Sequence, residues 1–392
     1  MKKPLATIVG AGCSKFGKRK NVMARELLVE AFLEAISYCK DPDIKGKIKL
    51  GVFGCYSEYF EHQSHLAPIL ADWLGFHNLP VIRTENACAS GSTALRTALF
   101  AIKSGLYDIV LVAGVEKMNN RTTSEANEAL AMASDIAIEQ WSGLTFAGIF
   151  ALMATHHMHK YNTTEEQMAL VAVKNHKNAY YNPKAHMQKI ITVEEVLNSR
   201  VIAWPLKLYD CSLITDGAAC LILTSPEIAH KFNDSPVDII ASGHSTDHSS
   251  IIEREEISSI KGIRIAAKEA FDYAGIGIKE VNVAELHDCF TIAEIIEYEE
   301  LGIAEKGKGG KLLEEGATNL HGWLPVNTSG GLKAKGHPVG ATGIAQVYEI
   351  YLQLRGEAGP RQVKGAKIGL TQNMGGSGST HFVHILKSRE YG

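Results

Sequence analysis

Short apolar runs rich in β-branched residues alternate with longer amphipathic stretches along the first part of the chain. The runs at 6–12, 50–56, 108–114 and 218–225 (ATIVGAG, LGVFGCY, DIVLVAG and AACLILTS) are typical of buried strands. The stretches at 23–38 and 91–105 are typical of helices. This alternation predicts an α/β protein with a largely parallel sheet whose two faces are covered by helices.

The second half of the chain repeats this order. Runs at 237–243, 263–276, 283–289 and 366–372 follow their counterparts at an offset of roughly 230 to 260 residues, as a duplicated module would. We therefore expect two similar halves. The first half consists of residues 1–118 and 210–235, and the second half of residues 236–392. An inserted cap domain at 119–209, with polar, His- and Met-containing helices expected over 124–140 and 163–181, separates the two segments of the first half.

Composition narrows the function. With 392 residues, 45% of them hydrophobic, the chain can bury more than one core. The net charge is −3 and no basic block occurs, which argues against nucleic acid and against an anionic membrane surface. No apolar stretch approaches 18 residues, and no targeting signal is visible. The seven cysteines show no C-x-x-C spacing, which favours reduced thiols in a cytoplasm over disulfides or zinc.

Two reactive side chains occupy matching places in the two halves. Cys88 lies in ENACASGS and His337 in GHPVG, each in a glycine-rich segment that opens a predicted helix. A helix N-terminus stabilises a thiolate, so we expect a lowered pKa for Cys88 and a nucleophilic role in place of simple packing. A nucleophilic thiol needs a base, and His337 is the candidate.

Two further motifs complete the candidate site. The strand-like run AELHDCF ends on His287 and Cys289, whose side chains would share one face if the strand continued, while Asp288 would point away and be structural. The glycine-rich end of QNMGGSGST suits a tight turn. The backbone N–H of Gly375 could also form an oxyanion hole together with the amide of Cys88.

A group of histidines in the predicted insert raises the question of a metal. Some have helical spacing, but no carboxylate or cysteine completes a site of known geometry, so we expect solvated helix faces and no metal. These histidines are His156, His157, His159, His176 and His186.

The motifs ENACASGS, HDCF, GGLKAKGHPVGATG and NMGGSGS, in this order and over nearly the whole chain, resemble those of the thiolases. The resemblance implies a five-layer αβαβα fold of two similar halves with a loop domain over the active site. It implies Claisen chemistry on coenzyme A thioesters without a further cofactor. By position it makes Cys88 the nucleophile that becomes acetylated and His337 its base. His287 would hold the thioester oxygen of the second substrate together with His337.

The resemblance also suggests substrate contacts. Ser212, in YDCSLITDGAA, matches a serine that contacts the pantetheine arm, and Met153 matches a methionine that lines the pocket.

The chain departs from many thiolases at one position. Those enzymes end in C-x-G-G-G and use that cysteine to remove the α-proton of the incoming acetyl-CoA, whereas here the position is Asn373. Cys289 is the remaining thiol beside a catalytic histidine, so we expect it to be the relocated acid–base. Thiolases of the sterol-carrier-protein type and their archaeal relatives carry this arrangement.

The expected activity is acetyl-CoA C-acetyltransferase: two acetyl-CoA give acetoacetyl-CoA and CoA, reversibly. Three alternatives stay open. A decarboxylating ketosynthase of the same fold would not need Cys289. A degradative 3-ketoacyl-CoA thiolase would cleave longer chains. A non-catalytic acyl-CoA-binding or lipid-binding scaffold would be expected to lack Cys88 or His337.

The resemblance also suggests partners. Family members are dimers or tetramers, so a homodimer or homotetramer is expected. Similar archaeal thiolases are associated with hydroxymethylglutaryl-CoA synthase through a small OB-fold, zinc-ribbon protein, at the entry to the mevalonate pathway of isoprenoid synthesis. That association would withdraw the product of an uphill condensation.

Overall fold

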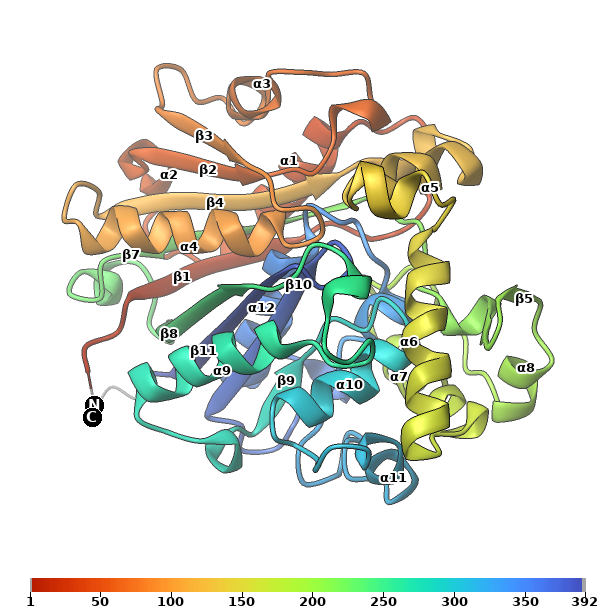
Figure 1. Cartoon of the computed structure of the whole chain (residues 1–392). Helices are drawn as coiled ribbons and strands as arrows, with labels where there is room; N and C mark the ends of the chain where they lie inside the picture. The colour runs from red at the N-terminus through yellow and green to blue at the C-terminus, as the bar shows by residue number, and fades with distance from the viewer. Residues whose placement is uncertain (1, 390–392) are drawn as a thin grey trace.

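The structure is a computed structural model that describes residues 2–389. Within these residues, nine strands form one sheet in the order β3-β2-β4-β7-β1-β8-β11-β10-β9, seen in Figure 1. The strands of the first half are β1 (Ala6–Cys13), β2 (Leu50–Gly54), β3 (Val81–Thr84), β4 (Ile109–Glu116) and β7 (Gly217–Thr224). Those of the second half are β8 (Val237–Thr246), β9 (Val283–Glu285), β10 (Ile368–Gly375) and β11 (Thr380–Ser388).

The two halves are built alike, as predicted. The order β2-β4-β7-β1 in the first half is matched by β9-β10-β11-β8 in the second, and the halves meet where β1 pairs with β8. Each strand expected from the repeated runs is present. The sequence pattern did not single out the edge strand β3 or the last strand β11.

The expectation of a largely parallel sheet was wrong. Parallel ladders join β2 to β3, β2 to β4 and β9 to β10. The remaining ladders, β4 to β7, β7 to β1, β1 to β8, β8 to β11 and β11 to β10, are antiparallel. The physical reason is clearest at β10 and β11, because the short turn at 376–379 cannot carry a crossover helix and must reverse the chain.

Helices cover the outer face of each half of the sheet. The two halves also face each other, and a middle layer of helices lies between them. The α-helices of the framework are α1 (Ala24–Ser37), α2 (Ile44–Lys47), α3 (Leu66–Trp73), α4 (Ser90–Lys103), α9 (Lys261–Ala274), α10 (Thr291–Glu300), α11 (Gly309–Glu314) and α12 (Thr342–Arg355). Helices α1 and α3 form one outer layer, α4 and α12 the middle layer, and α9 and α10 the other outer layer.

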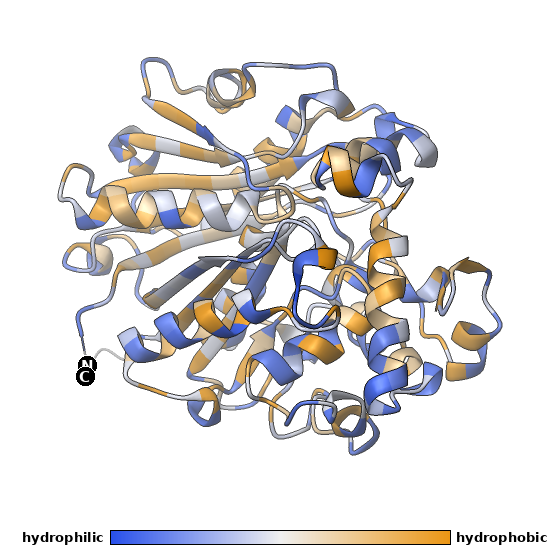
Figure 2. Ribbon diagram, in the orientation of Figure 1, coloured by the Kyte–Doolittle hydropathy of each residue, from blue (hydrophilic) through white to orange (hydrophobic). Residues whose placement is uncertain are grey.

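Strand β4 shows how the sequence produces these layers. Val110 and Val112 pack in the core formed with α4 and α12, whereas Ile109 and Leu111 pack in the core formed with α1 and α3. Alternate residues of a strand point to opposite faces, so a strand covered on both sides is apolar throughout. Figure 2 shows β4 as mostly orange.

Helix α12 is buried on almost every side, in contrast to the outer helices α1, α3 and α9. Its polar side chains have internal partners: Gln346 donates to the carbonyl oxygen of Gln372 at 2.8 Å, and Glu349 pairs with Arg361 at 3.0 Å. Buried polar groups are tolerated when they are hydrogen-bonded. The middle layer is therefore a rigid support for the loops that precede α4 and α12.

The segment between β4 and β7 forms the side of the molecule drawn in yellow and green in Figure 1. It contains α5 (Thr123–Ala131), the π-helical turn η3 (Ile136–Gln140), α6 (Phe146–Tyr161), α7 (Glu165–Tyr180), α8 (Val193–Leu197) and the hairpin β5 (Val201–Ala203) and β6 (Leu206–Lys207). Helices α6 and α7 pack against α10 of the second half. The helix expected over 124–140 is broken at 132–135, whereas the one expected over 163–181 is present as α7.

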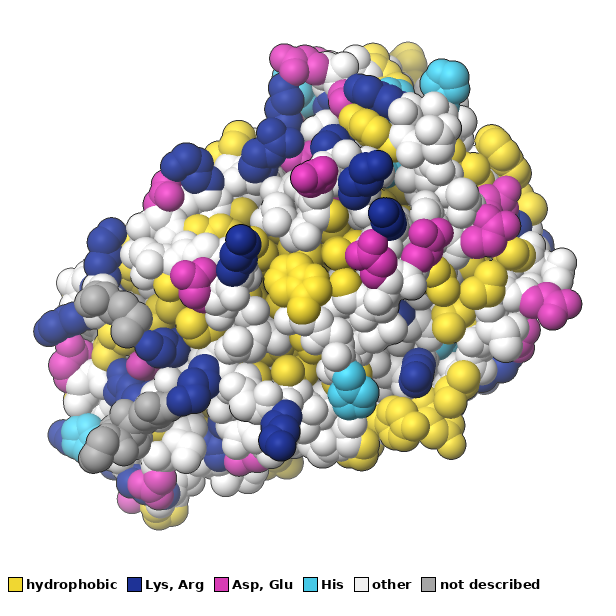
Figure 3. All heavy atoms as spheres, turned by 90° about the horizontal axis from the view of Figure 1, so that it is seen from below, with side chains coloured by type: hydrophobic (Ala, Val, Ile, Leu, Met, Phe, Trp, Pro, Cys, Tyr) yellow, Lys and Arg dark blue, Asp and Glu magenta, His cyan; other side chains and the backbone are white. Residues whose placement is uncertain are grey.

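Among residues 2–389, no helix has both the length and the apolarity of a membrane span. Figure 3 shows the molecule from below, where Lys and Arg side chains are interspersed with Asp and Glu. This face carries no continuous field of one charge sign.

Candidate active site

Cys88 lies in a tight loop between β3 and α4. The preceding residue, Ala87, has a φ of 49°, which a side chain with a Cβ rarely adopts. The Ser90 hydroxyl stabilises this turn, because it donates to the carbonyl oxygen of Ala87 at 2.6 Å and accepts from the amide of Asn86 at 3.0 Å. Backbone strain of this kind is typical of functional sites. The loop presents the Cys88 thiol ahead of the first turn of α4.

His337 lies in the loop that precedes α12. The sequence interpretation placed it at the helix start, but α12 begins five residues later, at Thr342, and Pro338 is therefore not in its first turn. The backbone of His337 pairs with Ile214 as an isolated bridge. The imidazole is buried, and its Nδ1 lies 2.7 Å from the Thr342 hydroxyl.

His287 and Cys289 follow β9, and here the geometry differs from expectation. Strand β9 ends at Glu285, and the amide of Cys289 donates to the carbonyl oxygen of His287 at 2.8 Å, so the chain turns where a continued strand was expected. Asp288 points away from the thiols, as predicted, and accepts from the amides of Leu332 and Lys333 at 2.7 and 3.1 Å. It therefore supports the segment that leads to His337.

The structure brings three of the expected catalytic residues together. The Cys88 sulfur and one ring nitrogen each of His287 and His337 all lie within 4.8 Å of one another. The two imidazole rings meet edge to face, with their centroids 5.0 Å apart. Cys289 is not one of these three residues, but it lies near enough to Cys88 for a charge on that thiol to raise the pKa of Cys289. Side chains separated by about 200 residues in sequence thus converge on one thiol.

The electrostatics of the site contradict one expectation. Burial and the nearby Glu116 carboxylate raise the pKa of the Cys88 thiol to about 12, although N–H groups of Gly376 and of Cys88 itself favour the thiolate. Desolvation therefore raises the pKa of the Cys88 thiol by more than the helix N-terminus lowers it. Burial likewise lowers the pKa of His337 to about 3 and holds the pKa of His287 well below its usual range. The resting site is a neutral thiol facing two neutral imidazoles.

Asn373, which occupies the place of the usual second cysteine, connects two of these residues. Its Nδ2 lies 3.2 Å from the carbonyl oxygen of Cys88 and 2.8 Å from Nδ1 of His287, and its Oδ1 accepts from the Ser92 hydroxyl at 2.8 Å. Asn373, Ser92 and His287 are all buried. Sequence reasoning noted the replacement at this position but assigned no role to the asparagine.

The roles of the other expected site residues stay predictions. Met153 is fully buried on α6 in the core that also contains Cys289. Ser212 is half-buried, and its amide donates to the carbonyl oxygen of Cys289 at 2.9 Å. Gly375 ends β10 so close to the Cys88 loop that an added Cβ would lie 2.4 Å from the carbonyl oxygen of Asn86. The amide directed at the Cys88 sulfur belongs to the next residue, Gly376.

Two buried carboxylates that sequence reasoning missed hold the loops in place. Glu116 accepts from the amides of Tyr56 and Gly340 at 2.8 and 3.1 Å, and burial raises its pKa to about 7. Glu297 accepts from the amide of His287 at 2.9 Å. Glu116 ends a strand and Glu297 lies on an amphipathic helix, so neither offers a pattern that separates it from an exposed carboxylate.

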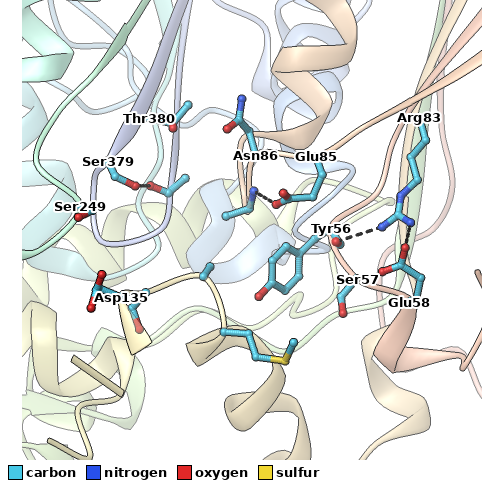
Figure 4. A pocket seen from close by; sticks show the side chains of 15 residues that line it. Tyr56, Ser57, Glu58, Arg83, Glu85, Asn86, Asp135, Ser249, Ser379 and Thr380 are labelled. Atoms are coloured by element: carbon cyan, nitrogen blue, oxygen red, sulfur yellow. Dashed lines mark hydrogen bonds and ion pairs between the residues drawn. The ribbon is translucent and has the colours of Figure 1, made fainter. Parts of the chain in front are cut away.

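A cavity of about 770 Å³ opens on the other side of the Cys88 loop (Figure 4). Asn86, Ala87 and Gly375 line it, but His287, His337 and Cys289 do not. Its lining also includes the carboxylates of Glu58, Glu85 and Asp135, and its guanidinium, Arg83, pairs with Glu58. An acidic cavity is a poor match for the phosphates of coenzyme A, so we do not assign the thioester to it.

A thiol with two imidazoles is also a set that can bind zinc. Metal binding requires the thiolate, and burial opposes its formation here. The expectation that the insert histidines lie on solvated helix faces was wrong for His157 and His176, which are buried. The insert histidines have separate protein partners: Nδ1 of His157 lies 2.7 Å from Thr163, that of His176 lies 2.9 Å from the carbonyl oxygen of Lys189, and that of His186 lies 3.0 Å from Thr215. We therefore interpret the Cys88 cluster as a reaction centre.

Comparisons with known proteins agree with this interpretation. Residues 6–227 match the family description "Thiolase, N-terminal domain" and residues 243–388 match "Thiolase C-terminal domain-like". The acetyl-CoA acetyltransferase of Methanothermobacter thermautotrophicus is 44% identical over 97% of this chain and 98% of that protein. Sterol carrier protein 2 of Bos taurus is 40% identical over 78% of this chain and 59% of that protein.

Solved structures share the fold. The "Ltp2-ChsH2(DUF35) aldolase" superposes with a TM-score of 0.85 at 26% identity and covers 99% of both chains. Human mitochondrial 3-ketoacyl-CoA thiolase superposes with a TM-score of 0.76 at 18% identity, covering 98% of this chain and 100% of that chain. Two family matches that together span both halves, and relatives of this identity over almost the full length, leave one conclusion: the chain belongs to the thiolase family.

Proposed function

We propose that the chain is an acetyl-CoA C-acetyltransferase that condenses two acetyl-CoA into acetoacetyl-CoA and CoA, and catalyses the reverse thiolysis. The observation that carries the proposal is the convergence of Cys88, His287 and His337 within 4.8 Å at the meeting point of the two halves. Nearly full-length relatives named acetyl-CoA acetyltransferase support the choice of substrate.

The first half-reaction transfers an acetyl group to the enzyme. The Cys88 sulfur attacks the thioester carbon, Nε2 of His337 takes the thiol proton, and the same imidazole returns that proton to the departing CoA sulfur. Because both groups are neutral at rest, proton transfer accompanies the attack. Backbone amides next to the thiol, including the expected Gly375 and the observed Gly376, stabilise the oxyanion.

The second half-reaction forms the carbon–carbon bond. Nε2 of His337 takes the thiol proton of Cys289, and the resulting thiolate removes a proton from the methyl group of a second acetyl-CoA. His287 and the protonated His337 hold the enolate oxygen while the enolate carbon displaces Cys88 from the acetyl group. The departing Cys88 thiolate then takes the proton from His337, so that all three groups return to their neutral forms. Burial raises the pKa of Cys289 well above its usual value. The neutral thiol is the form that thiolysis needs, since there it donates the proton, so the reaction is best followed in that direction.

The experiment compares thiolysis of acetoacetyl-CoA by the wild type and by Cys289→Ala, with acetylation of Cys88 followed by intact mass. We expect the variant to be acetylated by acetyl-CoA while its turnover falls by a factor on the order of 10² or more. Cys39→Ala, at a half-buried cysteine in the core near α1, is the matched control and should keep its turnover.

The other outcomes favour the competing functions. Unchanged turnover of Cys289→Ala would make that thiol a packing residue and favour a decarboxylating ketosynthase. A wild type that never acetylates at Cys88 would favour a non-catalytic scaffold. Faster cleavage of longer 3-ketoacyl-CoA substrates would favour a degradative thiolase, with Met153 and Ser212 as the substrate-contacting residues to vary.

We further propose a cytoplasmic homodimer or homotetramer that supplies acetoacetyl-CoA to hydroxymethylglutaryl-CoA synthase, through a small OB-fold, zinc-ribbon protein, for mevalonate and isoprenoid synthesis. The name of a protein with the same fold, the "Ltp2-ChsH2(DUF35) aldolase", includes a second, DUF35 component, which supports pairing with another protein. Seven free cysteines suit a reducing compartment. Purification of the tagged chain from its own cells, with mass and composition of the complex measured, tests both ideas.

A further inference from the structure

The two imidazoles of the site have different hydrogen-bonding partners at Nδ1. His287 meets the amide group of Asn373, and His337 meets the hydroxyl of Thr342. In a neutral imidazole one nitrogen carries the proton and the other carries a lone pair. The hydrogen-bonding partner at Nδ1 therefore decides whether Nε2 faces the reacting groups as a proton donor or with a lone pair.

The orientation of the Asn373 amide follows from its neighbours. The carbonyl oxygen of Cys88, 3.2 Å away, can only accept, so the atom that faces it must be the amide nitrogen. The Ser92 hydroxyl then donates to Oδ1 at 2.8 Å. The second N–H of Asn373 is directed at Nδ1 of His287 at 2.8 Å, and that nitrogen must accept.

Thr342 makes the opposite demand on His337. Its hydroxyl lies 3.1 Å from the carbonyl oxygen of Pro338, four residues earlier, and donates to it as Thr often does in a helix. The oxygen then accepts from Nδ1 of His337 at 2.7 Å, which leaves a lone pair on Nε2.

We infer that Asn373 is a positioning residue that holds His287 in the tautomer protonated at Nε2, opposite to the tautomer that Thr342 imposes on His337. His287 is then a hydrogen-bond donor to the substrate oxygen, and His337 is the base for Cys88. This rests on the proposed function, because the roles are assigned within that reaction. Many thiolases have a catalytic cysteine at this position, which transfers a proton. Here Asn373 instead fixes which ring nitrogen of His287 carries the proton.

Two features keep this arrangement in place. Asn373 and Ser92 are almost completely buried, so water does not compete for the amide. Gly343 of α12 leaves the space they need: an added Cβ there would lie 2.2 Å from the Ser92 hydroxyl and 2.6 Å from Oδ1 of Asn373. Burial also lowers the pKa of both histidines, so neither ring is charged at neutral pH.

The tautomer is measured directly by ¹⁵N NMR of ring-labelled histidine in the full-length enzyme, with His287 assigned from the spectrum of His287→Gln. We expect Nδ1 of His287 to show the shift of an unprotonated nitrogen and Nε2 that of a protonated one. In Asn373→Asp the carboxylate accepts from Nδ1, so the two shifts should exchange. A wild-type His287 protonated at Nδ1 would overturn the inference. This readout does not depend on turnover, so it stands even if the proposed activity fails.

Kinetics give the second test. Asn373→Asp should lower acetoacetyl-CoA thiolysis by a factor of about 10² or more at pH near 8, because Nε2 loses its proton, while acetylation of Cys88 changes by less than about tenfold. As the pH falls toward about 6, the variant should regain activity relative to the wild type, because the carboxylate favours the imidazolium, which again donates from Nε2.

The control is Asn233→Asp, which places the same acid at another buried asparagine whose amide donates to the carbonyl oxygens of Val9 and Tyr38. It should lower stability without altering the pH profile or the ratio of the two half-reactions. If Asn373→Asp slows both half-reactions equally and shows no recovery in acid, Asn373 serves only to support the fold. Failure of wild-type Cys88 to acetylate would instead count against the proposed function.

Discussion

At the scale of single residues, the sequence points to candidate reactive groups but does not predict their charge states. The motifs around Cys88, His287 and His337 are visible in the chain, and the structure brings these residues together. The lowered thiol pKa expected from the helix N-terminus is not found, because desolvation depends on side chains from the whole molecule. The bond from Asn373 to His287 spans 86 residues, and local patterns cannot predict it.

Glu116 provides a test of how the loops around Cys88 are held. Its carboxylate faces four donors, the amides of Tyr56, Ser57 and Gly340 and the Cys55 thiol. Glu116→Gln turns an NH₂ group toward one of these donors, so we expect a loss of about 1–3 kcal/mol and a Tm lower by several degrees, with slower acetylation of Cys88. Glu255→Gln, at an exposed carboxylate, is the control and should leave both unchanged. An unaltered Tm in Glu116→Gln would mean that the loops do not depend on the carboxylate.

His384 on β11 makes the stability depend on pH. It is fully buried, both ring nitrogens lack a partner among the described residues, and burial lowers its pKa to about 3. In the unfolded chain the pKa of this histidine is about 6.5. The contribution of the buried, neutral His384 to folding stability is therefore fully present above pH 6.5 and is lost as the pH falls toward 3.

At pH 4.5 the loss from His384 amounts to about 3 kcal/mol. His384→Phe removes it, so the stability of the variant relative to the wild type should rise by about this amount between pH 7.5 and pH 4.5 in urea unfolding. The same difference at both pH values would show that His384 does not titrate as described.

At the scale of secondary-structure elements, the periodicity of apolar residues predicts which residues are buried. It predicts less well which strands pair and in which direction. The run at 108–114 becomes β4, and its alternation places successive side chains in two different cores. Part of the error in strand direction arises because β11 was not recognised, and the short turn before it reverses the chain. The rest arises because β7, although expected as a strand, runs antiparallel to both β4 and β1. Helix α12 contains Gln346 and Glu349, yet it is buried, since partners distant in sequence satisfy these side chains.

The contact between α4 and the start of α12 is tight enough to test. A Cβ on Gly91 would lie 2.8 Å from the carbonyl oxygen of Gly340 and 3.3 Å from Ile344. Although alanine favours helix by about 1 kcal/mol, Gly91→Ala should destabilise the protein by about 1–3 kcal/mol and reduce turnover, because it separates the loops that carry Cys88 and His337. Gly148→Ala on α6, with its nearest atoms at 3.5 Å, should be tolerated. Equal Tm values for the two variants would contradict this packing.

At the scale of the whole molecule, the repeat predicts two similar halves but not their dependence on each other. One core contains Ala94 and Leu95 of α4 together with Ile344 and Val347 of α12. The halves also share the pairing of β1 with β8, and helices α6 and α7, which precede β7 in the chain, pack on α10 of the second half. Duplication explains the architecture, whereas the shared middle layer explains why the reactive residues of the two halves meet.

This dependence predicts the behaviour of the separated halves. A chain cut between residues 235 and 236 leaves each part with one face of the middle layer exposed, and exposed apolar surface costs roughly 25 cal/mol per Å². We expect fragments 1–235 and 236–392, expressed singly, to be insoluble or to lack a cooperative unfolding transition. Expressed together, they should associate and recover thiolysis, because the cut falls in the short loop before β8 and the shared core can re-form. A cooperative transition in either fragment alone would show that the halves are independent domains. The middle layer would then be an interface between two domains that each have a complete hydrophobic core, rather than one core to which both halves contribute.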